Sequence, residues 1–346
     1  MQRSNTSIQV MSGSTQLMVN FCDAVVDLQS GDTGKGKVTH SLLRSGEYDL
    51  VLRYNGGSNA GHTIYHNGEK IVTHQVPAGV LYGIRSLIGI GCVVNVRKLE
   101  EEIAYLNANG FKTDGLIFVD SRAHVVTEEH LAEDNKDVAI GTTKQGIGPA
   151  YRNKYGRTGI RIGDHLINTD KFTIVDSLNL LAGSRVLAEG AQGFALDIDW
   201  GDYPYVTSSH CTIGSVVLNG VSPRKIRKIY GVAKAYETYV GTKDFGMHCE
   251  ELRKVQIHGQ EFGATTGRPR KCNWINLDKV AYAARVNDIT HLVVNKIDIL
   301  DQANAYRYFK NDVECDAGSR LGLIDVIVRA LPDNVQVIFS DTPHSI

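Results

Sequence analysis

Short apolar runs rich in β-branched residues recur along the chain, and stretches with helical spacing separate them. The runs that predict strands are residues 23–28, 48–54, 70–76, 86–91, 116–120, 185–190, 228–236, 290–296 and 335–340. Residues 98–108 and 323–331 have the spacing of helices. Strands that alternate with helices predict an α/β fold, a single domain around a large, mostly parallel β-sheet with long functional loops.

Two glycine-rich loops follow the first two predicted strands. Residues 30–37 are S-G-D-T-G-K-G-K, and residues 53–63 are R-Y-N-G-G-S-N-A-G-H-T. Glycines let backbone amides turn inward toward an anion, and Lys35 adds positive charge. Asp32 puts a carboxylate into this cationic turn, where it suits metal binding or proton transfer, and His62 lies near the end of the second loop. The two loops predict a nucleotide phosphate that is activated as well as held.

The composition narrows the class of protein. The chain has 346 residues, of which 42% are hydrophobic, and its net charge of -1 gives no general attraction to nucleic acid. No apolar run approaches the roughly 18 residues that cross a bilayer. Six cysteines occur singly, which fits a reducing cytoplasm and argues against a disulfide framework or a zinc site. Residues 1–20 are polar and predict a flexible extension, in which Met18 is a possible start, before a catalytic domain over residues 21–346.

Two familiar nucleotide motifs match only in part. The first loop is not a Walker A motif, because Lys37 is followed by Val38 where that motif has Ser or Thr. Residues 295–298, N-K-I-D, resemble the guanine-binding motif of GTPases, but the chain has no Asp-x-x-Gly magnesium motif. A switch protein that only binds guanine nucleotides is therefore a distant alternative. Lys296 and Asp298 stay candidates for a base pocket.

Three further segments are dense in functional residue types. Residues 141–161 mix Gly, Thr, Arg and Lys, residues 189–210 combine Gln, Asp and Thr, and residues 263–271 place two hydroxyls and two arginines between glycines. Arginine binds carboxylate and phosphate groups through two parallel hydrogen bonds. Long loops in a compact domain are usually functional, so these segments predict sites for a phosphate or a small dicarboxylate.

Together these segments resemble the adenylosuccinate synthetase family, from Asp23 to about Asp301. The matching motifs are G-D-T-G-K-G-K, N-A-G-H-T, G-T-T-K-Q-G-I-G-P-A-Y, E-G-A-Q-G with D-Y-P-Y-V-T-S-S, G-A-T-T-G-R and N-K-I-D-I-L-D. The resemblance implies a homodimeric carbon–nitrogen ligase. In this reaction a nucleoside triphosphate phosphorylates O6 of a 6-oxopurine nucleotide, and the amine of L-aspartate then displaces the phosphate.

The resemblance also implies a role for each matching residue. Asp32 would be the base that deprotonates N1 and a ligand of Mg²⁺, and the Gly61 carbonyl would complete the metal site. His62 would stabilise charge between O6 and the γ-phosphate, and Lys35 would hold the β- and γ-phosphates. The residues expected at the nucleotide substrate are Asn59, Thr143, Gln192, Leu196 and Thr207, with Arg157 reaching it from the neighbouring subunit. Those expected at the carboxylates of aspartate are Thr265, Thr266 and Arg268, and those at the donor nucleotide are Gly34, Lys35, Gly36, Lys37, Thr63, Arg270, Lys296, Asp298 and Ser340.

Departures from the family pattern bear on specificity. Thr33 stands where the usual enzyme has Glu, and Tyr239 stands where Arg is common; Lys144 and Gln145 replace the usual Gly-Arg. Thr342 takes the place of a glycine in the loop that normally closes over guanine. The last change makes ATP or dATP a possible donor, whereas Asp298 favours GTP.

The first loop is closest to a viral branch of the family that makes N6-succino-2-amino-2′-deoxyadenylate. Asp27, Leu28 and Gln29, with Thr33, carry this resemblance, although Asp32 is the residue of the ordinary enzymes. It implies dGMP as acceptor and a place in the cytoplasm of a host cell. The alternative is an ordinary adenylosuccinate synthetase that uses IMP and GTP. Neither alternative involves nucleic acid or a membrane as partner.

Overall fold

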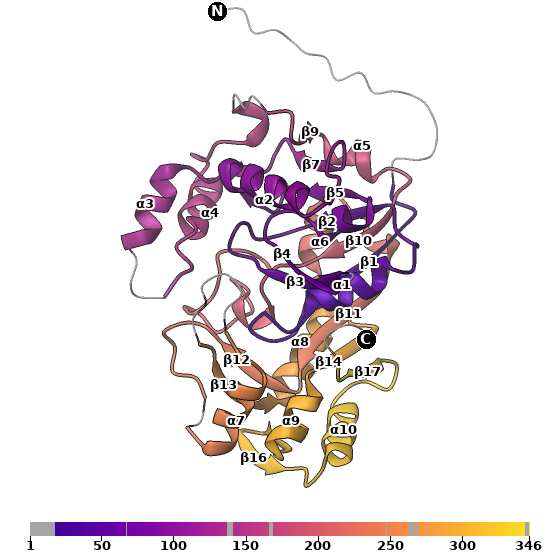
Figure 1. Cartoon of the computed structure of the whole chain (residues 1–346), viewed down its shortest axis with the longest axis vertical. Coiled ribbons are helices and arrows are strands. Elements are labelled where there is room, and N and C mark those ends of the chain that lie inside the picture. Colours follow the sequence, from indigo (N-terminus) through magenta and orange to yellow (C-terminus); the bar gives the residue numbers. More distant parts are fainter. Residues whose placement is uncertain are drawn as a thin grey trace, which may run out of the picture.

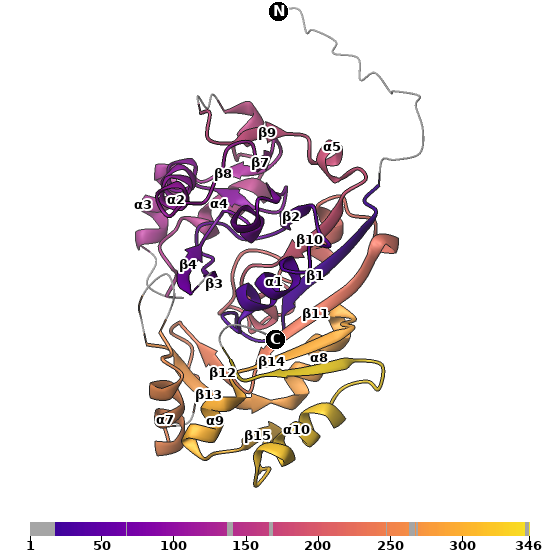
Figure 2. The same ribbon diagram turned by 45° about the vertical axis from the view of Figure 1, so that its right-hand side comes forward.

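The computed structural model describes residues 18–66, 68–136, 141–165, 169–246, 248–262, 267, 269–342 and 346. Nine strands form one sheet in the order β17-β14-β11-β1-β10-β2-β5-β7-β9, and every neighbouring pair is parallel. The last three strands of this sheet along the chain, β11, β14 and β17, lie on one side of β1 (Figures 1 and 2). The expected single α/β domain is confirmed.

The nine strands of the main sheet are β1 (Phe21–Asp27), β2 (Leu50–Arg53), β5 (Arg85–Ile88), β7 (Ile117–Asp120), β9 (Thr173–Val175), β10 (Arg185–Glu189), β11 (Ile226–Lys234), β14 (His291–Asn295) and β17 (Gln336–Ser340). The α-helices are α1 (Lys35–Leu43), α2 (Val96–Ala108), α3 (Glu128–Lys136), α4 (Ile147–Tyr155), α5 (Ser177–Leu181), α6 (Gly214–Leu218), α7 (Glu250–His258), α8 (Leu277–Asn287), α9 (Ile297–Ala303) and α10 (Arg320–Arg329). Short 3₁₀ helices span Ala78–Tyr82, Ile162–Asp164, Phe194–Leu196 and Pro223–Lys225.

The main sheet is buried on both faces. Successive residues of a strand point to opposite faces, so a strand covered on both sides is apolar throughout. In β1, Ala24 and Val26 pack into one hydrophobic core and Val25 into the other. The same alternation occurs in β14, where Leu292 and Val293 belong to different cores. This explains why the strand signals in the sequence are continuous apolar runs.

Smaller sheets flank the main one. A second, four-stranded sheet has the order β12-β13-β15-β16, from β12 (Tyr236–Tyr239), β13 (Lys271–Asn276), β15 (Arg307–Lys310) and β16 (Val313–Asp316). A hairpin joins β3 (His62–His66) to β4 (Glu69–Thr73), and β6 (Val93–Val94) pairs with β8 (His124–Val125). The run 70–76 was predicted as a strand and does contribute one, but to this hairpin, which presents His62 and Thr63.

The start of the chain joins the fold earlier than the predicted domain boundary. Residues 1–17 lie outside the described residues, so the flexible extension stays a prediction. Val19 is already buried in the core, and the Asn20 amide donates to the Ser184 carbonyl at 2.9 Å. None of the helices in the described part of the chain combines the length and apolar character that crossing a bilayer requires.

Candidate active site

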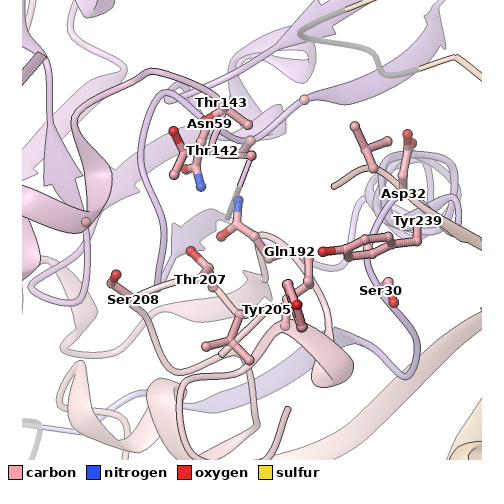
Figure 3. Close-up of a pocket in the computed structure, with 18 of the residues that line it drawn as sticks. Ser30, Asp32, Asn59, Thr142, Thr143, Gln192, Tyr205, Thr207, Ser208 and Tyr239 are labelled. Carbon is pink, nitrogen blue, oxygen red and sulfur yellow. The ribbon is translucent and has the colours of Figure 1, made fainter. Parts of the chain in front are cut away.

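A cavity of about 550 Å³ lies where the carboxyl ends of the central strands meet. Ligands bind at this edge of an open parallel sheet because the loops that follow its strands converge there. The predicted site residues that line the cavity are Asp32, Gly34, Lys35, Gly36, Asn59, Gly61, His62, Thr63, Thr143, Gln192, Leu196, Thr207 and Arg270. In Figure 3, Asn59 and Thr143 lie on one side of the cavity and Asp32 on the other. The fold thus brings together residues from five of the predicted loop segments.

The first loop is braced by a buried carboxylate at the end of β1. Asp27 Oδ1 accepts hydrogen bonds from the amides of Gln29 at 2.9 Å and Gly31 at 3.2 Å. Asp27 Oδ2 accepts from the Thr33 hydroxyl at 2.5 Å and from Lys35 Nζ at 2.9 Å. The Gln29 side chain in turn donates to the carbonyls of Lys234 and Tyr236. The residues that suggested the viral branch therefore fix the shape of the loop.

The loop ends at the N-terminus of α1, which opens onto the cavity. Gly34 is the N-cap with a φ of 102°, and a Cβ there would lie 2.6 Å from Asn295 Nδ2. The same amide nitrogen donates to the Thr33 carbonyl at 2.7 Å. Helix N-termini attract anions because their first amides have no partner within the helix. The N-K-I-D segment therefore supports the loop through its asparagine.

His62 is a neutral imidazole with its proton on the nitrogen that has no partner. Burial, followed by the charges of Arg53 and Lys35, holds the pKa of His62 well below its usual value. Arg53 Nη2 lies 3.2 Å from His62 Nδ1. Because guanidinium only donates, Nδ1 must accept, which leaves the proton on Nε2. Nε2 is buried and has no hydrogen-bond partner among the described residues. His62 is one of the residues that line the cavity, and its Nε2–H is a hydrogen-bond donor that no described residue uses.

Asp32 faces a cation from a distant part of the chain. Its carboxylate pairs with Arg270 Nη2, and Arg270 Nη1 pairs with the buried carboxylate of Glu261. Burial lowers the pKa of Arg270 to about 10, so its guanidinium stays charged near neutral pH. The Nε of Arg270 and the Oε1 of Gln192 are buried without a partner in the described part of the chain. With His62 Nε2, these are three buried polar atoms without a described partner, and all three belong to residues that line the cavity.

Several predicted donor residues lie together but do not line this cavity. Lys37 Nζ donates to Ser340 Oγ at 2.7 Å and to the Thr342 carbonyl at 2.8 Å. Burial lowers the pKa of Lys37 to about 8 and raises that of Asp298. Lys296 donates to the Gly259 carbonyl and to Glu261, both away from solvent. The Lys296 amide, at the start of α9, also donates to the Ser340 carbonyl at 3.1 Å, so the end of β17 contacts both α1 and α9.

Other predicted residues lie elsewhere or cannot be placed. Arg157 follows α4, is exposed, has a φ of 63° and does not line the cavity of its own chain. Thr265, Thr266 and Arg268, expected at the aspartate carboxylates, lie outside the described residues. Their roles stay predictions.

Some residues of the site carry no clear signal in the sequence. Glu133 and Arg152 form an ion pair between α3 and α4 and line the cavity. Glu261 forms ion pairs with Lys234, Arg270 and Lys296, although no motif in the sequence distinguishes it. Tyr239, singled out only as a departure from the family, lines the cavity in Figure 3.

The donor set of the expected metal site fits a hard cation. Asp32 and Gly61 both line the cavity and offer a carboxylate and a backbone carbonyl, the oxygen ligands that Mg²⁺ prefers. A second group, Asp197, Asp199 and His210, lies outside the predicted set. Asp197 accepts hydrogen bonds from the amides of Asp199 and Trp200 through Oδ1 and from the amide of Cys211 through Oδ2. The Asp197 carboxylate in this group therefore already binds the backbone amides of its own loop.

Comparison with known proteins identifies the family. The family model for adenylosuccinate synthetase matches residues 24–174 and 169–309. The adenylosuccinate synthetase of Wolinella succinogenes is 39% identical over 337 residues, which covers 81% of this chain and 79% of that protein. The solved structure of fully ligated adenylosuccinate synthetase from Plasmodium falciparum superposes with a TM-score of 0.81 at 28% identity, covering 94% of this chain and 98% of that one.

A viral enzyme is also similar. The succinoaminodeoxyadenylate synthetase of cyanophage S-2L, solved with dGMP and with dATP as energy donor, superposes with a TM-score of 0.69 at 23% identity, covering 90% of this chain and 99% of that one. This likeness concerns the fold alone. The predicted family is confirmed, whereas the closer resemblance to the viral branch is not, since the more similar sequences are named adenylosuccinate synthetases. The chain therefore belongs to the adenylosuccinate synthetase family, whose members are carbon–nitrogen ligases.

Proposed function

We propose that this chain joins L-aspartate to carbon 6 of IMP at the expense of GTP, giving adenylosuccinate, GDP and phosphate. The names of its relatives at about 40% identity support this acceptor over dGMP. The observation that carries the proposal is the meeting of a carboxylate, a neutral imidazole donor and a buried ammonium group in one cavity, from Asp32, His62 and Lys35.

The chemistry follows from the acceptor. The amide-like N1–H and C6=O of a 6-oxopurine form a poor nucleophile until N1 loses its proton. Asp32 takes that proton, and O6 then attacks the γ-phosphorus while the bond to the β,γ-bridging oxygen breaks. His62 Nε2–H donates to the charge that develops between O6 and the phosphoryl group. The aspartate amine next attacks carbon 6, and the phosphate leaves with the former O6.

Mg²⁺ belongs to the proposal as a family property. Asp32 and the Gly61 carbonyl would hold it, and when bound it neutralises charge on the transferring phosphoryl group. In the structure the Asp32 carboxylate is paired with Arg270. Arg270 must therefore share or release this carboxylate when the site fills, and the phosphates of the donor offer it an alternative partner.

A second acceptor, dGMP with ATP or dATP as donor, has one observation in its favour. Guanine differs from hypoxanthine by its 2-amino group, which needs space and an acceptor. Gln192 lines the cavity, and its Oε1 is a buried acceptor without a partner as far as the described residues extend. The product would then be N6-succino-2-amino-2′-deoxyadenylate, with ADP or dADP and phosphate.

Steady-state assays that cross the two acceptors with GTP, ATP and dATP test the proposal. We expect aspartate-dependent phosphate release with IMP and GTP, and at least tenfold lower kcat/KM with dGMP, as about 1.4 kcal/mol of discrimination gives. Turnover with dGMP alone would reverse the assignment. Hydrolysis of GTP that does not depend on aspartate would favour the guanine-nucleotide switch.

We also propose a homodimer in which Arg157 binds the phosphate of the acceptor held by its partner, in keeping with its exposed position outside its own cavity. Arg157→Ala should raise the KM for the acceptor. Mixing it with Asp32→Asn should restore part of the activity, since one site of the mixed dimer keeps both residues. No recovery in mixed dimers would argue against a shared site. Thr265, Thr266 and Arg268 are the proposed aspartate contacts, and the cytoplasm is the proposed location.

A further inference from the structure

Glu261 has a fully buried carboxylate that holds three cations. Its Oε2 accepts a hydrogen bond from Lys234 Nζ at 2.9 Å and pairs with Arg270 Nη1. Its Oε1 accepts from the Tyr236 hydroxyl at 2.5 Å and from Lys296 Nζ at 2.9 Å. Burial alone would raise the pKa of Glu261, but Lys234 and Lys296 outweigh burial and hold it below its usual value. The carboxylate is therefore ionised, and all four donors meet a full negative charge.

Two of the three cations belong to the predicted donor site and come from different segments. Arg270 lines the cavity and follows the segment expected to bind aspartate. Lys296 is the N-cap of α9, in the segment expected to bind the donor base. Arg270 also pairs with Asp32 through its second terminal nitrogen. A continuous chain of ion pairs thus runs from Lys296 through Glu261 and Arg270 to the proposed base.

In the described part of the chain, Glu261 is the carboxylate that both donor-site cations share. The side chain of Arg270 is only 8% exposed, and its other carboxylate partner in the described part of the chain is Asp32. Lys296 otherwise donates to the neutral Gly259 carbonyl. Two cationic side chains paired with the same carboxylate repel each other, and each is long enough to adopt several rotamers. Glu261 removes the repulsion and selects one rotamer of each.

We propose that Glu261 is a positioning residue that holds Arg270 and Lys296 where both meet the donor nucleotide. Glu261 does not line the cavity itself, so it acts through these two side chains. The inference rests on the proposed function only in taking a nucleoside triphosphate as the ligand.

Lys234 provides a matched control. It is as buried as Glu261 and shares the same carboxylate oxygen with Arg270, but it does not line the cavity and its second partner is Thr238 Oγ1. Glu261→Gln keeps the size of the side chain and removes its charge, whereas Lys234→Met removes one cation and leaves the Glu261 carboxylate paired with Arg270 and Lys296. A purely structural cluster would respond to both changes in the same way.

The test is a calorimetric titration of GTP and, separately, of ATP with MgCl₂ into the unaltered chain, Glu261→Gln and Lys234→Met. Both variants should have a lower Tm. Only Glu261→Gln should weaken the better-bound nucleotide, by about tenfold or more, as expected when charge-assisted contacts lose their geometry. Equal Kd values for the two variants would overturn the inference.

Two further measurements keep the outcomes distinct. If Glu261→Gln does not fold, Glu261→Asp keeps the charge but draws the carboxylate away from its donors, and wild-type affinity in that variant would overturn the inference. Aspartate-dependent phosphate release is measured in the same preparations. Suppose that Glu261→Gln selectively loses nucleotide binding but the unaltered chain releases no phosphate with aspartate. That result contradicts the proposed function and leaves the inference about Glu261 standing. Binding of neither nucleotide by the unaltered chain contradicts both.

Discussion

At the scale of single residues, the arrangement of charges decides what each side chain can do. Lys35 and Arg270 are both buried cations beside the cavity, yet each has its own carboxylate, Asp27 for one and Asp32 with Glu261 for the other. A buried cation without such a partner would be costly. The site therefore keeps its positive charge in place before any phosphate arrives.

Replacing Asp32 tests its role as the base. Asp32→Asn keeps the size of the side chain and its ability to accept from Arg270, but it cannot take a proton. We expect kcat to fall by about 100-fold or more, in the range of general-base effects, while the Kd for the triphosphate in the absence of metal changes little. Steady-state kinetics and calorimetry measure the two quantities.

Asp312→Asn is the matched control for this change. Asp312 is also exposed, also has a positive φ, 58° against 57° for Asp32, and lies between β15 and β16 away from the cavity. It should leave kcat unchanged. Near-normal kcat in Asp32→Asn would remove Asp32 from the mechanism as base.

At this scale, the sequence identified the site residues better than it identified the side chains that contact them. Asp32, Lys35 and His62 stand out because glycine-rich loops with charged residues are unusual, and the structure places all three at one cavity. Glu261 and Asp27 could not be assigned, because their importance comes from side chains distant in the chain. The tautomer of His62 likewise depends on Arg53, which belongs to another strand.

At the scale of elements, the site depends on where strands end and on how α1 begins. The loops after β1, β2 and β10 supply Asp32, Asn59 and Gln192. The N-terminus of α1 is fixed by contact with Asn295 at the end of β14. The N-K-I-D segment therefore directly supports the conformation of the first glycine-rich loop.

Gly34→Ala tests this contact. A side chain at a φ of 102° costs on the order of 1–3 kcal/mol, and the Cβ would lie 2.6 Å from Asn295 Nδ2. We expect a lower free energy of unfolding together with weaker binding of the triphosphate. Gly46→Ala is the comparison, since Gly46 has a φ of 71° but no atom within 4 Å of the added carbon. Gly46→Ala should affect stability alone, and an equal loss of affinity in both would refute the contact.

The element order was largely predictable, and its limits have physical causes. Continuous apolar runs identify strands that are buried on both faces, and all of these runs contain strands. The run 70–76 pairs in a hairpin instead of the main sheet, because pairing depends on neighbours that a local pattern does not contain. Short strands such as β15 and β16 bury few side chains, so their pattern is weak.

At the scale of the whole molecule, two histidines with lowered pKa values link stability to pH. Burial, and next the charges of Lys154 and Arg161, lower the pKa of His124 to about 4. His62 is lowered as well. An unfolded histidine takes up its proton near pH 6.5, so between about pH 6.5 and 4 the unfolded state binds more protons than the folded state. Stability therefore falls as the pH falls through this window.

Urea unfolding at pH 7, 6 and 5 measures this dependence. We expect the free energy of unfolding to decrease from pH 7 to pH 5. In His124→Gln the decrease should be smaller, because that variant has no imidazole to protonate on unfolding. An identical pH dependence in the two proteins would contradict the assignment.

The central claim is that O6 of the purine captures the γ-phosphoryl group after Asp32 takes the N1 proton. The most direct test supplies IMP labelled with ¹⁸O at position 6, together with GTP, L-aspartate and MgCl₂, and follows the released phosphate by mass spectrometry. The account predicts one labelled oxygen in each phosphate released with adenylosuccinate. Phosphate without label, with the ¹⁸O found in water, would contradict it.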